Sequence, residues 1–258
     1  MSGHLSVVGL GPGDARCLTP EAHEALAAAD ALYGYGPYLD RVPARANQTR
    51  HASDNREERA RAAAALRAAA AGARIAIVSG GDPGVFAMAA AVCEEIEAGP
   101  DEWRALDVAF VPGITAMLAV AARIGAPLGH DFCALSLSDN LKPWALVERR
   151  LEAAARAGFV IALYNPLSRA RPWQFGAAIE LLRRYLPPAV PVIFGRAVTR
   201  AGERISVTTL DRVDAVQTDV QLDMATLVIV GSRDTRVIAR PGRQPLVYTP
   251  RAVAEVSA

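Results

Sequence analysis

Three short apolar runs, each followed directly by a glycine- and proline-rich turn, are the feature that most constrains the fold of this chain. The runs are Leu5–Gly9, Ile75–Ser79 and Val108–Val111, and the turns are Gly9–Asp14, Ser79–Phe86 and Pro112–Ala116. Continuous apolar runs of this length are typical of strands buried in a parallel sheet. The carboxyl ends of parallel strands meet at one edge of the sheet, where α/β proteins bind ligands. We therefore expect the three turns to form one site.

Strand and helix signals alternate through the first half of the chain. Thr19 precedes Pro20 as a helix cap, and a helix over Glu57–Ala71 is expected to be capped by Asp54 or Ser53. A further helix is expected over Val85–Glu97. These elements predict an α/β fold with a mostly parallel N-terminal sheet.

In the second half of the chain, the predicted strands and helices no longer alternate regularly. The strands expected at Val190–Phe194 and Arg204–Thr209 have no helix between them, which predicts an antiparallel pair and a mixed sheet. At ~100–200 residues per domain, 258 residues allow two modest domains. We predict an N-terminal α/β domain over 1–112, a C-terminal mixed-sheet α/β domain over 113–245, and a tail over 246–258.

Composition argues against several classes of function. The net charge is +1, from 28 basic and 27 acidic residues, so a nucleic-acid partner is not expected. Cys17, Cys93 and Cys133 lie far apart, and the four histidines lack metal-ligand spacing, so neither a disulfide framework nor a metal site is expected. No apolar stretch approaches the ~18–20 residues of a membrane span, and no signal segment is evident. We expect a soluble, cytoplasmic protein.

The first turn nearly matches the dinucleotide fingerprint Gly-x-Gly-x-x-Gly. Its sixth position is Asp14 rather than glycine, and Pro12 has no N–H to offer a phosphate. Leu32–Gly34 also stands where an acidic residue should close the second strand. The turn therefore suits a neutral or cationic ligand better than a polyphosphate, although a dinucleotide-dependent oxidoreductase is the rival of a different class.

The other two turns have both structural and functional interpretations. Gly80 and Gly81 allow a ligand to approach the backbone, while Asp82 either caps the following helix or supplies a carboxylate to the ligand. Thr115 either caps its helix or donates a hydrogen bond to the ligand. Neither turn has the lysine-containing pattern of a phosphate loop.

Six segments, taken in order, resemble the tetrapyrrole (corrin-pathway) S-adenosylmethionine-dependent methyltransferases. They are VGLGPGD at Val8–Asp14, SGGDPGVF at Ser79–Phe86, PGITA at Pro112–Ala116, YNP at Tyr164–Pro166, TRAGER at Thr199–Arg204 and TLVIVG at Thr226–Gly231. The resemblance is reinforced by GYGPYLD at Gly34–Asp40, SDNREER at Ser53–Arg59, GHDF at Gly129–Phe132, SLSDNLKPW at Ser136–Trp144 and YNPLSRARPW at Tyr164–Trp173. It implies the two-domain fold of that family, a homodimer, and methylation of a corrin precursor with ring contraction.

The resemblance also implies a site for S-adenosylmethionine, with S-adenosylhomocysteine as the product. Carried over position by position, the donor contacts in the first domain are Pro12, Gly80, Gly81, Asp82, Val85, Thr115 and Ala116. Those in the second domain are Asn165, Val198 and Thr226. The donor has a cationic sulfonium and no phosphate, so a nearby carboxylate such as Asp82 is electrostatically suitable.

The second ligand implied is a tetrapyrrole bearing several carboxylates, which arginine side chains recognise well. The substrate-binding candidates are Asn140, Lys142, Arg169 and Arg171, with Arg196, Arg200 and Arg204 on the later hairpin. Ring contraction moves protons, and we rank Asp139 ahead of His130 and Asp54 as the acid–base group. Alternatives are methylation at another ring carbon, action on a cobalt-loaded substrate, and a non-catalytic tetrapyrrole carrier.

Overall fold

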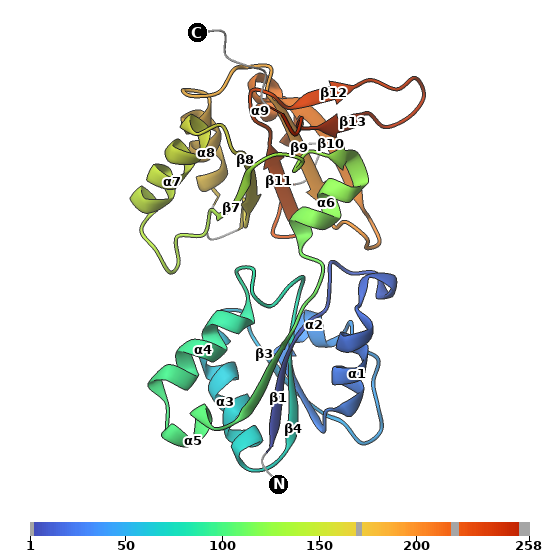
Figure 1. Cartoon of the computed structure of the whole chain (residues 1–258), viewed down its shortest axis with the longest axis vertical. Helices are drawn as coiled ribbons and strands as arrows, with labels where there is room; N and C mark the ends of the chain where they lie inside the picture. Colours follow the sequence, from blue (N-terminus) through green and yellow to red (C-terminus); the bar gives the residue numbers. More distant parts are fainter. Residues whose placement is uncertain (1–2, 169–171, 218–221, 253–258) are drawn as a thin grey trace. The chain divides into compact units, whose positions relative to one another are not determined.

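The computed structural model describes residues 3–168, 172–217 and 222–252. The chain divides into two compact units, Met1–Ala116 (unit 1) and Met117–Ala258 (unit 2). Each unit contains a five-stranded sheet (Figure 1).

The sheet of unit 1, predicted to be mostly parallel, is parallel in all its strand pairs, with strand order β3-β2-β4-β1-β5. Its strands are β1 (His4–Gly9), β2 (Ala31–Tyr35), β3 (Thr49–Ser53), β4 (Arg74–Ser79) and β5 (Asp107–Val111). The three strands that lead into the glycine-rich turns are β4, β1 and β5, which are direct neighbours. The predicted gathering of the turns at one sheet edge is therefore confirmed.

Helices cover both faces of this sheet (Figure 1). Leu5 and Val7 of β1 pack on one side with α3 (Glu58–Ala70), α4 (Met88–Ala98) and α5 (Asp101–Arg104). Val8 packs on the other side with α1 (Pro20–Ala28) and α2 (Gly36–Leu39). Because β1 is buried on both faces, its sequence is continuously apolar rather than alternating.

Of the three predicted helix starts in unit 1, one is confirmed and two need correction. The Thr19 hydroxyl accepts a hydrogen bond from the Ala22 N–H at 3.1 Å, so the predicted cap of α1 is confirmed. In α3, however, neither Ser53 nor Asp54 is the cap, because the residue at that position is Glu57. Ser53 Oγ instead accepts a hydrogen bond from Arg61. Helix α4 begins at Met88 rather than Val85, since Phe86 has a left-handed backbone with φ of 52°.

Unit 2 has the predicted mixed sheet, with strand order β10-β9-β11-β8-β7. Its strands are β7 (Phe132–Ser136), β8 (Val160–Tyr164), β9 (Pro191–Arg196), β10 (Arg204–Thr209) and β11 (Thr226–Val230). Strands β7 and β8 are parallel, and the other pairs are antiparallel. The expected hairpin is β9–β10.

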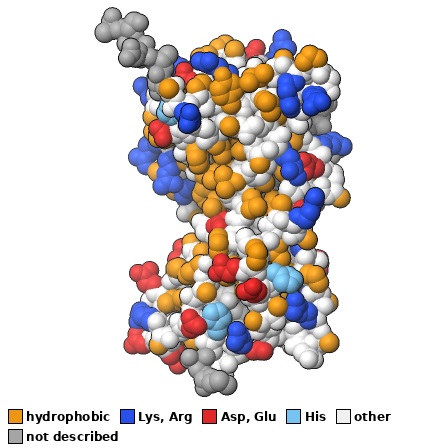
Figure 2. Space-filling view, turned by 45° about the vertical axis from the view of Figure 1, so that its right-hand side comes forward, with side chains coloured by type: hydrophobic (Ala, Val, Ile, Leu, Met, Phe, Trp, Pro, Cys, Tyr) orange, Lys and Arg blue, Asp and Glu red, His pale blue; other side chains and the backbone are white. Residues whose placement is uncertain are grey.

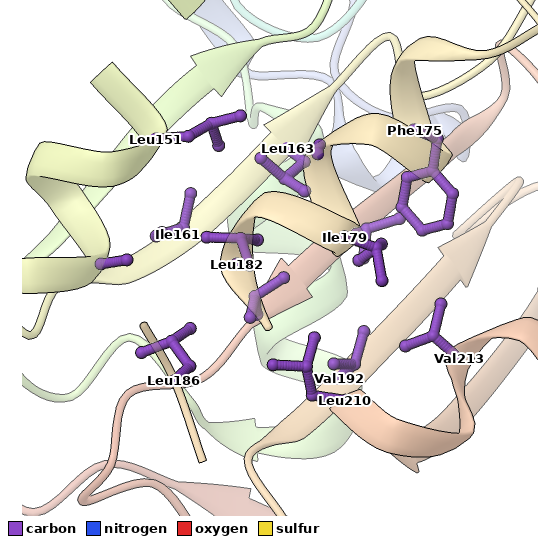
Figure 3. Packing of buried hydrophobic residues seen from close by; sticks show 14 of the residues in the cluster. Leu151, Ile161, Leu163, Phe175, Ile179, Leu182, Leu186, Val192, Leu210 and Val213 are labelled. Atoms are coloured by element: carbon purple, nitrogen blue, oxygen red, sulfur yellow. The ribbon is translucent and has the colours of Figure 1, made fainter. Parts of the chain in front are cut away.

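The main core of unit 2 lies between this sheet and the helices α7 (Trp144–Arg156), α8 (Gln174–Leu182) and α9 (Val213–Gln217). Figure 3 shows Leu151 of α7, Ile161 of β8 and Phe175 of α8 among the buried residues of this cluster. On the other face, α6 (Ala116–Ile124) approaches β9 so closely that a Cβ at Gly195 would lie 2.3 Å from Val120. The helix and the sheet are therefore in direct contact at this glycine.

A small third sheet joins β12 (Arg236–Ile238), β13 (Leu246–Tyr248) and β6 (Gly125–Ala126). The stretch expected to be a tail thus begins with a strand. The following residue, Thr249, donates a hydrogen bond from its hydroxyl to the Pro127 carbonyl at 2.6 Å. Across the described residues, no helix is long and apolar enough to cross a membrane.

Candidate active site

The first two glycine-rich turns of unit 1 are joined by their backbones. Gly11 and Gly81 exchange reciprocal N–H to carbonyl hydrogen bonds of 3.0 and 2.9 Å, and the Leu10 N–H donates to the Ser79 carbonyl at 2.8 Å. Both glycines have left-handed backbones, with φ of 64° and 69°. This conformation strains other residues, which explains glycine at these two positions.

The third turn contacts the same backbone. A Cβ at Gly113 would lie 2.2 Å from the Gly81 carbonyl oxygen, and a Cβ at Gly9 would lie 2.7 Å from the Gly113 nitrogen. These distances are far below van der Waals contact, so side chains are excluded where the three turns meet. The N–H groups of Leu10 and Gly11 are also used within the protein, so they cannot cradle a phosphate.

Asp82 links the second turn to the third. Its Oδ1 accepts a hydrogen bond from the Gly84 N–H at 2.8 Å, and its Oδ2 accepts one from the Gly113 N–H at 3.0 Å. It does not cap α4, whose N-cap residue is Ala87. A carboxylate has about four acceptor sites, so Asp82 keeps acceptor capacity beyond these two bonds.

The other donor-site residues predicted in unit 1 lie around this junction. Thr115 is buried, and its Cα lies 3.6 Å from a Cβ built at Gly81. The Val85 N–H donates to the Asp82 carbonyl at 3.3 Å, and Ala116 is the first residue of α6. Asp82 also lines a cavity of about 400 Å³ beside the turns, together with Pro83, Gly84, Ala89, Ala90, Cys93, Phe110 and Pro112.

The three donor-site residues predicted in unit 2 lie at one end of its sheet. Asn165 follows β8 with φ of 52°, and its Nδ2 donates to Ser136 Oγ at 2.9 Å. Because Val228 pairs with Leu163, the antiparallel register brings Thr226 to the same end. Val198 is buried. The N–H of Ala197, the residue before it, donates a hydrogen bond at 2.9 Å to the carbonyl oxygen of Ala225, the residue before Thr226. The structure thus brings these residues together within unit 2.

Asp139 contacts a buried amide that the sequence analysis missed. Its Oδ2 accepts a hydrogen bond from Gln174 Nε2 at 3.2 Å, and Gln174 is only 2 % exposed. Among the residues that the structure describes, Gln174 Oε1 has no hydrogen-bond partner. The sequence signal was a polar residue opening a mostly apolar helix, which is too common to single it out.

The loop that carries Asp139 also holds the lysine predicted to bind substrate. Lys142 Nζ donates to the Ser138 carbonyl at 3.0 Å, and the Asn140 N–H faces Ser138 Oγ at 3.5 Å. Burial and, secondarily, the charge of Arg150 lower the pKa of Lys142, while the charge of Asp139 opposes this shift.

Not every basic candidate is available to a substrate in this structure. Arg169 and Arg171 lie outside the described residues. Trp173, which follows them in the sequence, is 49 % exposed, and its ring meets that of Trp144 edge-on with the ring centroids 4.9 Å apart. Arg196 forms an ion pair with Asp223 at 2.8 Å, so its charge is compensated. Arg200 and Arg204 are exposed.

The two lower-ranked acid–base candidates make local contacts. His130 Nδ1 accepts a hydrogen bond from the Asp131 N–H at 2.6 Å. The exposed Asp54 accepts one from the neighbouring Asn55 N–H at 3.3 Å. Within the described parts of the chain, no three His, Cys, Asp or Glu side chains gather in a way that would hold a metal ion.

Comparisons with known proteins agree with this architecture. A precorrin-3B C(17)-methyltransferase from Sinorhizobium sp. is 63% identical over 257 residues, covering 100% of both chains. A probable cobalt-factor III C(17)-methyltransferase from Salmonella typhimurium is 39% identical, covering 96% of this chain and 98% of that one. The crystal structure of the methyltransferase CobJ has a TM-score of 0.89 at 48% identity, covering 96% of this chain and 100% of that one. Residues 4–214 match the tetrapyrrole (corrin/porphyrin) methylases, and the chain belongs to that family.

Proposed function

We propose that this protein transfers the methyl group of S-adenosylmethionine to carbon 17 of precorrin-3B in cobalamin biosynthesis, with ring contraction to precorrin-4. The observation that carries this proposal is the full-length similarity, at 63% identity, to a precorrin-3B C(17)-methyltransferase. S-adenosylhomocysteine is then the second product.

The geometry of unit 1 supports a donor without phosphate groups, because the N–H groups of Leu10 and Gly11 already form hydrogen bonds within the protein. The turns offer backbone surface without side chains at Gly9, Gly81 and Gly113, and one carboxylate, Asp82, beside it. Pro12, Gly80, Val85, Thr115 and Ala116 of unit 1, and Asn165, Val198 and Thr226 of unit 2, complete the proposed donor contacts. Alignment of donor and acceptor supplies most of the catalysis, for which proximity and orientation are worth roughly 7–11 kcal/mol.

Asp139 is the proposed acid–base group for ring contraction. When ionised, its carboxylate accepts the N–H of Gln174, as the structure shows. When protonated, it would donate to Gln174 Oε1 after the amide turns about its terminal bond. A buried carboxamide with a spare oxygen therefore accommodates both protonation states. Asn140, Lys142, Arg169 and Arg171 are proposed to bind the substrate carboxylates.

A homodimer and a cytoplasmic location are part of the proposal, and both are supported by the family resemblance and the composition. Sedimentation of the purified protein at several concentrations tests the dimer. A single species with the mass of one chain at all concentrations would contradict it.

The reaction is tested by incubating the protein with methyl-labelled S-adenosylmethionine and precorrin-3B, following the pigment's mass and visible spectrum. We expect one labelled methyl group and the spectrum of a contracted ring. Pigment binding without label would indicate a carrier, and saturable NAD(P) binding without donor binding would indicate an oxidoreductase.

The same assay with cobalt-factor III tests the alternative substrate, which the cobalt-factor III relative supports. We expect the metal-free pigment to have the higher kcat/KM. The opposite ranking would replace precorrin-3B by the cobalt-loaded substrate.

A further inference from the structure

Arg41 contacts the first glycine-rich turn from a segment that no donor-site motif contains. Its Nη2 donates to the carbonyl oxygens of Leu10 at 2.9 Å and Gly11 at 2.8 Å. The Gly11 carbonyl also accepts the Gly81 N–H at 2.9 Å, so one oxygen joins Arg41 to both turns. Hydrogen bonds from a charged donor are stronger than neutral ones, so this link is well suited to fix the turn.

Tyr38, three residues earlier, supports the second turn. A Cβ at Gly80 would lie 2.6 Å from Tyr38 Cζ and 2.9 Å from its hydroxyl, so the ring packs directly on the glycine backbone. The guanidinium of Arg41 lies 5.9 Å from the centre of the same ring. Helix α2 and the residues just after it therefore hold both turns.

We propose that Arg41, supported by Tyr38, is a positioning residue for the methyl-donor site; this rests on the proposed function for the identity of the donor. Neither side chain is required to touch the donor. Arg41 fixes the carbonyl groups of Leu10 and Gly11, and Tyr38 fixes Gly80. Loss of either lets the turns relax away from the conformation that binds the donor.

Arg50 provides a matched control. It is also half-buried and donates two hydrogen bonds to backbone carbonyls, from Nη1 to Leu39 at 3.0 Å and from Nη2 to Val42 at 2.7 Å. Both acceptors belong to the segment that carries Arg41 rather than to a glycine-rich turn. Replacing Arg50 removes a comparable pair of bonds from the same part of unit 1.

The test compares Arg41→Met, Arg41→Lys and Arg50→Met by calorimetric titration with S-adenosylmethionine and with S-adenosylhomocysteine, alongside urea unfolding. We expect similar losses of stability in the two methionine variants. Arg41→Met should bind both ligands about tenfold more weakly or worse, whereas Arg50→Met should stay within about twofold of wild type. Arg41→Lys should recover part of the loss, and kcat at saturating donor should change little in Arg41→Met.

Binding of both ligands by Arg41→Met within about twofold of wild type would overturn the proposal. So would tighter binding of the cationic donor but weaker binding of the neutral product by Arg41→Met, which would mean direct charge repulsion rather than positioning. Wild-type protein that binds neither ligand would instead contradict the proposed function.

A second measurement applies if Arg41→Met does not fold. Gly80→Ala should weaken donor binding in the wild-type background but cost little more in a Tyr38→Ala background, where the clashing ring is gone. Additive losses in this double-mutant cycle would show that Tyr38 does not act through Gly80, and the proposal would fail.

Discussion

The two units offer different chemistry at the loops that follow their strands. In unit 1 the turns meet through backbone atoms, with glycines at the points of closest approach. In unit 2 the loops after β7 and β8 carry the polar side chains of Asp139 and Asn165, and Gln174 at the start of α8 contacts Asp139. The face of unit 2 seen in Figure 2 also gathers hydrophobic side chains bordered by basic ones. A rigid backbone surface suits one fixed ligand, whereas side-chain loops suit a large ligand with many substituents.

The largest effect is expected where a side chain takes part in the reaction. Asp139→Asn keeps the size of the side chain but cannot exchange a proton, so kcat for ring contraction should fall by about 10²–10⁴-fold. Donor affinity, which we propose depends on the backbone turns of unit 1, should stay within about twofold of wild type. Single-turnover assays with precorrin-3B and calorimetry with the donor measure the two quantities.

Asp131→Asn is the matched control for this prediction, because Asp131 is an exposed carboxylate in the loop before β7. It should leave kcat unchanged. A wild-type kcat in Asp139→Asn would remove Asp139 from the mechanism. A loss of donor affinity in Asp139→Asn would mean that donor binding does not depend on unit 1 alone.

The next largest effect is expected in the backbone junction of unit 1. Gly113→Ala places a Cβ 2.2 Å from the Gly81 carbonyl oxygen, and neither backbone can move without disturbing the other turns. The free energy of unfolding should fall by about 3 kcal/mol or more, and donor binding should be lost. Urea unfolding and calorimetry check this outcome.

Gly176→Ala in α8 of unit 2 is the opposite case. A Cβ there would meet nothing within 4 Å, and the residue is inside a helix. We expect the free energy of unfolding to rise by up to about 1 kcal/mol. If both alanine variants were equally stable, the turns of unit 1 would be more adaptable than the structure indicates.

A smaller effect is expected for Asp82. It distinguishes hydrogen bonding to the turns from direct attraction of the cationic donor. Asp82→Asn retains one acceptor oxygen and sets an NH₂ group against the other backbone N–H, so donor affinity should fall by about tenfold to a hundredfold. Because both carboxylate oxygens already bond to backbone N–H groups, we expect equal losses for S-adenosylmethionine and S-adenosylhomocysteine. A much larger loss for the cationic donor would show direct attraction of the sulfonium. Asp107→Asn, an exposed change in β5, is the control.

Much of unit 1 was predictable because its signals are local. The apolar runs of β1 and β4 are buried on both faces, and the cap at Thr19 depends on a residue three positions away. The edge strand β3 was missed, since its sequence Thr49–Ser53 is polar and it is largely exposed. The start of α4 was wrong because the left-handed Phe86 has no signature in the residue type.

The contacts of the candidate site were harder to predict because they join distant parts of the chain. Asp82 was identified as a carboxylate near the ligand, but its bond to Gly113 spans 31 residues. Gln174 lies 35 residues from Asp139 in the sequence. The two side chains meet only because α8 packs beside the loop that carries Asp139. Sequence patterns thus locate the turns, whereas the partners that fix them follow from the tertiary fold.

The smallest expected effect is on the pKa of Lys142, which lies in the same loop of unit 2 as Asp139. Lys142 is the only lysine of the chain, so isotopic methylation yields one lysine side-chain signal for NMR titration. We expect its pKa to lie below the ordinary lysine value. Asp139→Asn should lower it further by removing an attractive negative charge, and Arg150→Met should raise it by removing a repulsive positive one.

The functional consequence of this coupling follows from the sign of each shift. As pH rises through the pKa of Lys142, the side chain loses its charge and the KM for the carboxylated pigment should increase. In Arg150→Met this increase should begin at higher pH than in wild type. The donor KM should stay level if, as we propose, it is set by backbone turns that do not titrate. A donor KM that rises together with the pigment KM would mean that the two binding surfaces are not separate. Opposite shifts of the Lys142 pKa in the two variants would confirm that the charges of Asp139 and Arg150 both act on Lys142.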